Sequence, residues 1–164
     1  MKQLLLAVML AAALVSPALA ERFRIPADDP VVTIEAPEDW TVTQIDKGIE
    51  LSSDDDEVYL AIEGTPMKGL VDLTADAVTF LNRAGVTVDK STEKSSEGTV
   101  NGFKMNDIGW AGRDKDGDVL IHLMILTITP TKGVLFTYWA SPQGDKEHDE
   151  TIRKIIRSIR KIGG

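Results

Sequence analysis

Residues 119–141, VLIHLMILTITPTKGVLFTYWAS, carry the strongest indication of the fold. The first ten of them are apolar almost throughout, which is typical of a central strand covered on both faces. Thr131, Lys132 and Gly133 predict a turn, and the aromatic run 134–141 predicts a second strand. We therefore expect a hairpin inside a sheet, with other elements packed on both sides of it.

The preceding residues predict two more strands. Asn101-Gly102 favours a two-residue hairpin turn because both residues tolerate positive φ. The turn joins residues 103–112 to residues 86–100, which alternate but are polar or charged at almost every position after Val88. A strand with so little to bury suits an exposed sheet edge, where lysines discourage pairing with other chains.

The N-terminal part of the chain predicts further strands. Residues 31–36 alternate, residues 41–53 read as a hairpin that turns at 46–48, and another strand begins at Val58. Residues 21–30 contain two prolines and no periodicity, so we interpret them as an N-terminal arm.

Two helices complete the pattern. The first is predicted over 73–84, with Thr74 as its N-cap and Gly85 in a left-handed C-terminal cap. The last begins near Asp145 and carries a stripe of isoleucines. The stripe consists of Ile152, Ile155, Ile156, Ile159 and Ile162. We expect an α+β fold, a mainly antiparallel β-sheet flanked by helices, in a single domain over residues 31–164.

The first twenty residues have the pattern of a secretory signal peptide. Lys2 supplies the positive start, residues 4–15 the apolar stretch, and residues 18–20 the small-residue cleavage pattern. The apolar stretch is shorter than the ~20 residues that a membrane span needs, so no stable membrane anchor is expected. We expect cleavage after Ala20 and a soluble protein exported to the bacterial periplasm.

The chain has no cysteine, which removes thiol catalysis and thiolate metal sites.

The charge of the chain is strongly asymmetric. Its formal net charge is −8, which disfavours nucleic acid as a partner because phosphates are repelled. All 26 acidic residues precede residue 151, whereas the last fourteen residues carry five basic side chains. These are Arg153, Lys154, Arg157, Arg160 and Lys161. They form either a basic strip for an acidic partner or lipid head group, or the solvated face of the last helix, which we favour.

At this level the chain resembles the PsbP/DcrB-type domain family, whose fold is also used by a Ran-binding nuclear import factor. The matching features are VTIEAPEDW (32–40), the helix ending at Gly85, TVNGFKMNDIGW (99–110) and GVLFTYWASPQGDKEHDETIRKIIRSIR (133–160). The resemblance spans Val31 to Ile162 and implies an α/β/α sandwich that acts as a binding or assembly factor. It carries over no catalytic residue. The lipid-anchored members have a cysteine at the cleavage site, which this chain lacks, so no tether is implied.

Two acidic segments could hold a cation. In GRDKDGDVLI, the residues Asp114, Asp116 and Asp118 alternate as in a calcium loop, but the sixth position is Val119 and the twelfth is Ile125. An EF-hand needs glycine and glutamate there, so we favour a tight hairpin turn. The second segment is SSDDDE, residues 52–57. A weak cation site would require both loops at the same end of the sheet, and we favour two solvated turns.

The histidines and aromatic residues also have two interpretations. His122 lies within the most apolar strand and is expected to be packed with one nitrogen satisfied, while His148 is expected to be exposed to solvent. Four aromatic side chains line either a ligand pocket or the core. They are Trp40, Trp110, Tyr138 and Trp139. The core is the more usual place for strand aromatics.

No enzymatic motif is present. The chain lacks Gly-x-Ser-x-Gly, HExxH and a glycine-rich phosphate loop, and no cofactor is indicated. We expect a non-enzymatic binding or assembly module that contacts another envelope protein through residues 90–98 and the basic end of the last helix. The alternatives are a carrier or sensor for a small apolar ligand near the tryptophans, and a hydrolase that uses the acidic loops.

Overall fold

The computed structural model describes residues 20–67 and 70–163, so the predicted signal peptide lies outside the described residues except for Ala20. The described chain forms ten strands and two helices. In chain order they are β1 (Glu21–Ile25), β2 (Val32–Ala36), β3 (Thr41–Ile45), β4 (Gly48–Ser52), β5 (Val58–Pro66), α1 (Leu70–Arg83), β6 (Thr87–Val100), β7 (Phe103–Arg113), β8 (Asp118–Thr127), β9 (Lys132–Ala140), α2 (Pro142–Arg157) and β10 (Arg160–Lys161). None of the described helices is long and apolar enough to cross a membrane.

Seven strands form the main sheet in the order β3-β4-β5-β9-β8-β7-β6, and every neighbouring pair is antiparallel. The β8–β9 hairpin lies inside this sheet, as its apolar sequence predicted. Strand β6 forms one edge, also as predicted. A second, three-stranded sheet has the order β1-β2-β10.

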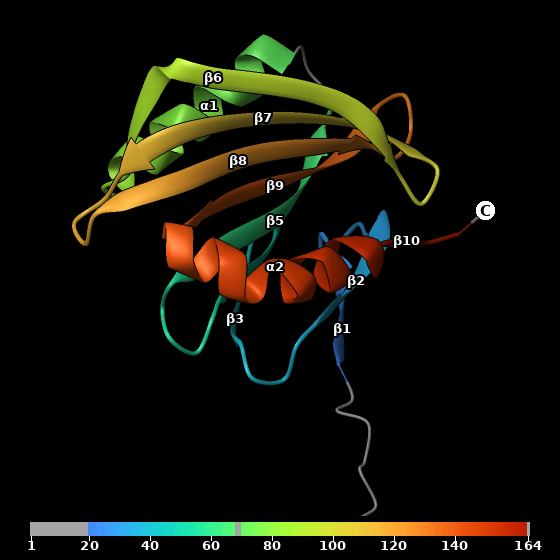
Figure 1. Ribbon diagram of the computed structural model, residues 1–164. Coiled ribbons are helices and arrows are strands. Elements are labelled where there is room, and N and C mark those ends of the chain that lie inside the picture. Colours follow the sequence, from blue (N-terminus) through green and yellow to red (C-terminus); the bar gives the residue numbers. More distant parts are fainter. Residues whose placement is uncertain (1–19, 68–69, 164) are drawn as a thin grey trace, which may run out of the picture.

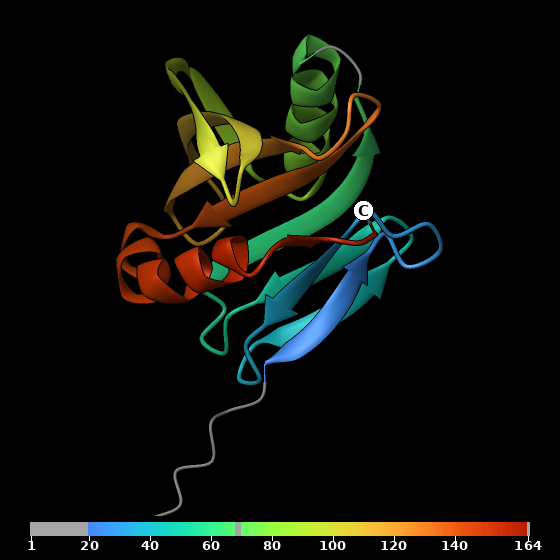
Figure 2. The ribbon, with the colours of Figure 1, turned by 90° about the vertical axis from the view of Figure 1, so that its right-hand side faces the viewer.

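The two helices lie on opposite faces of the main sheet (Figure 1 and Figure 2). On one face, α1 packs Leu73, Ala77 and Leu81 against the sheet. On the other face, α2 and the small sheet pack around Phe136. This arrangement confirms the predicted α/β/α sandwich.

The position of β8 between two cores explains why its sequence is apolar at almost every position apart from His122. Ile121, Leu123 and Ile125 point to the core beneath α1, while Met124 and Leu126 point to the core beneath α2. Successive strand residues face opposite sides, so a strand between two cores needs apolar side chains at both parities.

The N-terminal arm prediction is wrong for residues 21–25. These residues form β1, which pairs with β2 in antiparallel register from Glu21↔Ala36 to Ile25↔Val32. Ile25 is fully buried in the core beneath α2. Strands β1 and β2 are consecutive in the chain and form a hairpin, which the Val31 amide closes by donating to the Ile25 carbonyl.

The helix ends also differ from the predictions. Helix α1 begins at Leu70, so Thr74 lies inside it, although Gly85 has the expected positive φ of 87°. Helix α2 ends at Arg157, where the Ser158 hydroxyl donates to the Ile155 carbonyl and accepts from the Glu35 amide. The chain then continues as β10 beside β2 instead of extending the helix.

Candidate functional site

Both acidic loops lie at the same end of the main sheet. Residues 53–57 connect β4 to β5, and residues 114–117 connect β7 to β8. Together with the end of α1 and the start of α2 they line a cavity of about 940 Å³. The loops therefore do meet at one end of the sheet, which the sequence alone left open.

A stacked aromatic pair lines part of this cavity. Tyr59 on β5 and Trp139 on β9 are cross-strand partners, and their ring centroids lie 3.9 Å apart at an interplanar angle of 20°. The ring centroid of Phe80 on α1 lies 6.4 Å from that of Tyr59 and 6.3 Å from that of Trp139. Phe80 is 37% exposed, so the cluster reaches the protein surface. Burial, followed by a hydrogen bond with Glu50, raises the pKa of Tyr59.

A second pocket of about 220 Å³ borders Phe80 between α1 and strands β4, β5 and β9. It is also acidic, with Glu50, Glu63 and Asp76 among its lining residues. Burial raises the pKa of Glu63. The aromatic cluster thus borders two pockets that both carry carboxylates.

The loop 53–57 is held in place by an internal hydrogen-bond network. Ser53, which is 2% exposed, donates its hydroxyl to Asp55 Oδ1 at 2.6 Å and accepts from the Val58 amide at 3.0 Å. The other carboxylate oxygen of Asp55 lies 3.0 Å from His148 Nε2 on α2. The Ser53 hydroxyl and then His148 lower the pKa of Asp55 to about 2.

The prediction that His148 is exposed to solvent is wrong. Its side chain is 16% exposed, and its ring meets that of Trp40 edge-on at a centroid distance of 5.5 Å. The charged residues around it in sequence suggested solvent, but the contact with Trp40 and Asp55 comes from elements far away in the chain.

The turn interpretation of residues 114–117 is confirmed. Asp114 Oδ1 accepts hydrogen bonds from the backbone amides of Asp116 at 2.8 Å and Gly117 at 3.0 Å. Asp116 pairs with Lys115, and Asp118 pairs with Arg113. The three carboxylates have separate partners and do not converge on one point.

His122 is half-exposed, which corrects the prediction of a packed histidine. Its side chain is 47% exposed, and its Nδ1 lies 3.2 Å from both carboxylate oxygens of Asp107 on β7. Gly109 lies opposite His122, and a Cβ there would come within 3.1 Å of the imidazole Cε1. The missing side chain leaves room for the ring to lie across β7.

The His122–Asp107 pair should make the stability of the fold depend on pH. The hydrogen bond to Asp107 raises the pKa of His122 despite partial burial, and Asp145 adds to this effect. The pair therefore stabilises the fold fully below the unfolded pKa of about 6.5, and this contribution is lost as the pH rises through the folded value. We expect NMR titration to give a pKa above 6.5 for His122 and a lower one in Asp107→Asn. An equal pKa in both proteins would contradict the assignment.

The three tryptophans do not form a common ligand pocket. Trp40 is buried in the core beneath α2, whereas Trp110 is buried in the core beneath α1 and donates its Nε1 to Glu93. Trp139 alone joins the aromatic cluster at the acidic cavity. The sheet separates Trp40, which precedes β3, from Trp110 on β7 and Trp139 on β9, whose side chains point to the face beneath α1.

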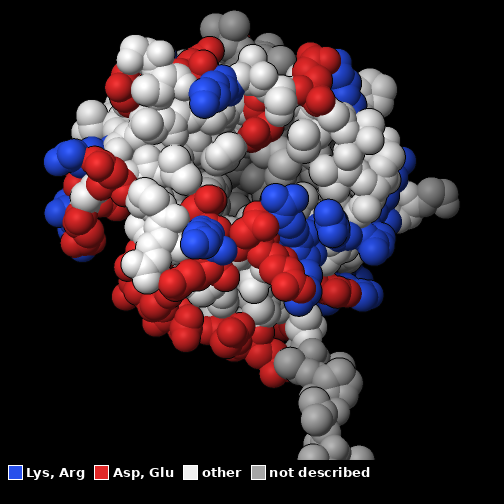
Figure 3. Space-filling view, viewed as in Figure 1, with Lys and Arg blue, Asp and Glu red and all other residues white. Residues whose placement is uncertain are grey.

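The predicted basic strip is divided between two elements. Arg153 and Lys154 lie on α2 and form ion pairs with Asp149 and Glu150, and Arg157 ends the helix. Arg160 and Lys161 lie on β10. Figure 3 shows basic side chains gathered at the C-terminal end of α2 and acidic side chains below its first turns.

The polar edge strand is interrupted in its predicted contact region. The register of β6 against β7 shifts between Asp89 and Lys94. Asp89 Oδ1 accepts from the Ser91 amide, and the Thr92 hydroxyl accepts from the Ala111 amide. Residues 87–89 and 94–100 each pair in continuous register with β7, and the pairing is broken between them.

No protein-family model and no curated protein matches the chain. Solved structures nevertheless share its fold. Cyanobacterial PsbP from Synechocystis sp. PCC 6803 has a TM-score of 0.59 at 11% identity, over 90% of this chain and 95% of that one. LpqN of Mycobacterium tuberculosis, described as involved in cell envelope biogenesis, has a TM-score of 0.58 at 12% identity, over 88% and 92%.

The Ran-binding protein Mog1p of Saccharomyces cerevisiae has a TM-score of 0.50 at 9% identity, over 86% of this chain and 95% of that one. These similarities confirm the expected PsbP-like fold. At such low identities they concern the fold alone.

Proposed function

We propose that the chain is an exported, non-enzymatic binding module that contacts a protein partner in the cell envelope. The signal-peptide pattern of residues 1–20 supports export. LpqN, which shares the fold, is involved in cell envelope biogenesis, and this is compatible with a role in the envelope. The contact surface is the aromatic cluster of Tyr59, Phe80 and Trp139 with its two bordering pockets, which we call the acid–aromatic groove.

The observation that carries the proposal is the composition of this groove. Among the described residues, nine carboxylates line the two pockets, against two lysines. The carboxylates belong to Asp55, Asp56, Glu57, Asp114, Asp116, Asp118, Glu50, Glu63 and Asp76, and the lysines are Lys47 and Lys115. Cations over an aromatic face gain roughly 0.5–2 kcal/mol, and surrounding carboxylates attract them further. The groove therefore fits a partner segment rich in arginine and lysine.

The same composition argues against the other partner classes. Nucleic acid phosphates would be repelled by the carboxylates. A purely apolar ligand would remove water from charged groups without replacing their hydrogen bonds, which costs free energy. A basic protein segment satisfies both the charges and the rings.

An arginine-rich peptide tests the groove directly. We expect a deca-arginine peptide to bind the purified protein, to bind more weakly as salt rises, and to lose roughly threefold to thirtyfold in affinity in Phe80→Ala. Tryptophan fluorescence or calorimetry measures the affinity. Phe80 is surface-exposed, so the variant should keep its fold.

Charge variants provide the matched control. Asp56→Asn removes one carboxylate from the groove, and asparagine tolerates the positive φ of 60° at this position. Glu97→Gln makes the same change of charge on the exposed strand β6, outside both pockets. Asp56→Asn should weaken binding more than Glu97→Gln. Equal effects, or no binding by the wild type, would overturn the proposed surface.

A further inference from the structure

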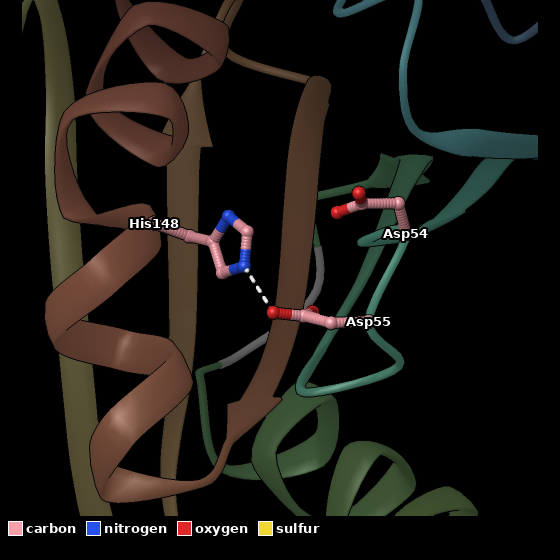
Figure 4. Close-up of side chains that lie close together, drawn as sticks. All are labelled: Asp54, Asp55 and His148. Carbon is pink, nitrogen blue, oxygen red and sulfur yellow. Dashed lines mark hydrogen bonds and ion pairs between the residues drawn. The ribbon is translucent and has the colours of Figure 1, made fainter.

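We propose that Asp54, Asp55 and His148 bind a divalent transition-metal ion of the zinc class. Among the described residues, one potential ligand atom from each of the three lies within 4.8 Å of the other two. The group joins the loop 53–57 to α2. His148 on α2 lies 93 residues after Asp55 in the sequence. Figure 4 shows the imidazole of His148 and the two carboxylates brought together by these two elements. This inference goes beyond the proposed function and does not depend on it.

The spacing of the atoms suits one shared ion. Zinc holds imidazole nitrogen at about 2.0–2.1 Å and carboxylate oxygen at about 2.0–2.2 Å, so ligand atoms around one tetrahedral ion lie about 3.3 Å apart. His148 Nε2 and Asp55 Oδ2 are 3.0 Å apart. A carboxylate oxygen of Asp54, which is exposed at the loop surface, lies within 4.8 Å of both of these ligand atoms.

Two of the ligands are held in place by groups that do not bind the ion. The edge-on contact with Trp40 orients the His148 ring, whose side chain is largely buried. Asp55 keeps one oxygen on the Ser53 hydroxyl and the Glu57 amide, which leaves the other oxygen facing His148. Such outer contacts typically change metal affinity by 10–100-fold.

The ligand types select the class of metal. Calcium and magnesium take oxygen ligands, whereas imidazole suits zinc, copper and nickel. The Asp114 turn offers carboxylates only, each with its own partner, and has no histidine. The ion would take the place of the His148–Asp55 hydrogen bond and would join the acidic loop to the first half of α2.

Zinc titration of the purified protein tests the site, with His122 as the matched control. His122 also pairs with one aspartate, but no third ligand atom lies close to it among the described residues. We expect calorimetry to show one zinc ion per chain, and a melting temperature several degrees higher at a hundredfold excess over Kd. His148→Gln should abolish both effects, His122→Gln should retain them, and calcium or magnesium should have none.

Two outcomes would overturn the site: no zinc binding by the wild type, or undiminished binding by His148→Gln. If His148→Gln fails to fold by circular dichroism, Asp54→Asn replaces it. Asp54 is exposed, so this variant tests ligation without disturbing the core. We expect it to weaken zinc binding at least tenfold, and unchanged affinity would equally count against the site.

Discussion

Replacing Phe136 by alanine should lower the free energy of unfolding by about 3–5 kcal/mol, the range for deleting a buried aromatic ring. Phe136 is 1% exposed. It lies on β9, in the interior of the main sheet, with Ile62 of β5 and Met124 of β8 as its cross-strand partners. All three belong to the core shared with α2 and the small sheet. Removing the ring therefore loses apolar burial and leaves a cavity between several elements that cannot all move inward.

Urea unfolding followed by circular dichroism measures this loss. Phe80→Ala is the matched control, because the same ring is removed from a position at the protein surface. It should cost clearly less than Phe136→Ala. A loss below about 1 kcal/mol for Phe136→Ala would show that the core collapses around the deletion or that this ring is less central than its burial indicates.

Replacing Gly144 by alanine should destabilise the protein by about 1–3 kcal/mol, the range for overpacking a buried site. Gly144 lies in the first turn of α2 and is buried. A Cβ there would lie 2.6 Å from Glu57 Cβ and 2.9 Å from the Glu57 carbonyl oxygen. That carbonyl also accepts a hydrogen bond from the Ser141 amide, so it is held in place. The helix or the loop must move, and the His148–Asp55 contact lies in the same interface.

The sign of this effect is diagnostic. Alanine in place of glycine within an unhindered helix stabilises by roughly 0.5–1 kcal/mol, so a stabilised variant would contradict the close packing of α2 on Glu57. Urea unfolding gives the sign. Lys146→Ala, at an exposed position of the same helix, should change stability by less than about 0.5 kcal/mol and serves as the control.

Features that depend on neighbouring residues could be predicted from the sequence. Asn101 and Gly102 form the expected hairpin turn with φ of 50° and 84°. Gly85 ends α1, and the 114–117 segment forms a turn held by Asp114. The central position of the β8–β9 hairpin could also be predicted, because apolar side chains at every strand position are favourable only when both faces are covered.

Which surfaces meet was decided by the tertiary structure alone. The loops 53–57 and 114–117 share a cavity because β5 and β8 start at the same end of the sheet, on either side of β9. Asn101 shows both what the sequence predicts and what it does not. Its turn was predicted, but its side-chain amide also donates to the carbonyls of Arg157 and Ile159.

The isoleucine stripe of the last helix likewise predicted burial but not the contacts that its residues make. It predicted correctly that Ile155 and Ile159 are buried. It did not predict that Ser158 ends the helix by bonding to Ile155 and Glu35, or that Arg160 then pairs with β2. The physical reason is that periodicity encodes which side chains leave water, whereas their partners are chosen by strand order and by packing summed over the whole chain.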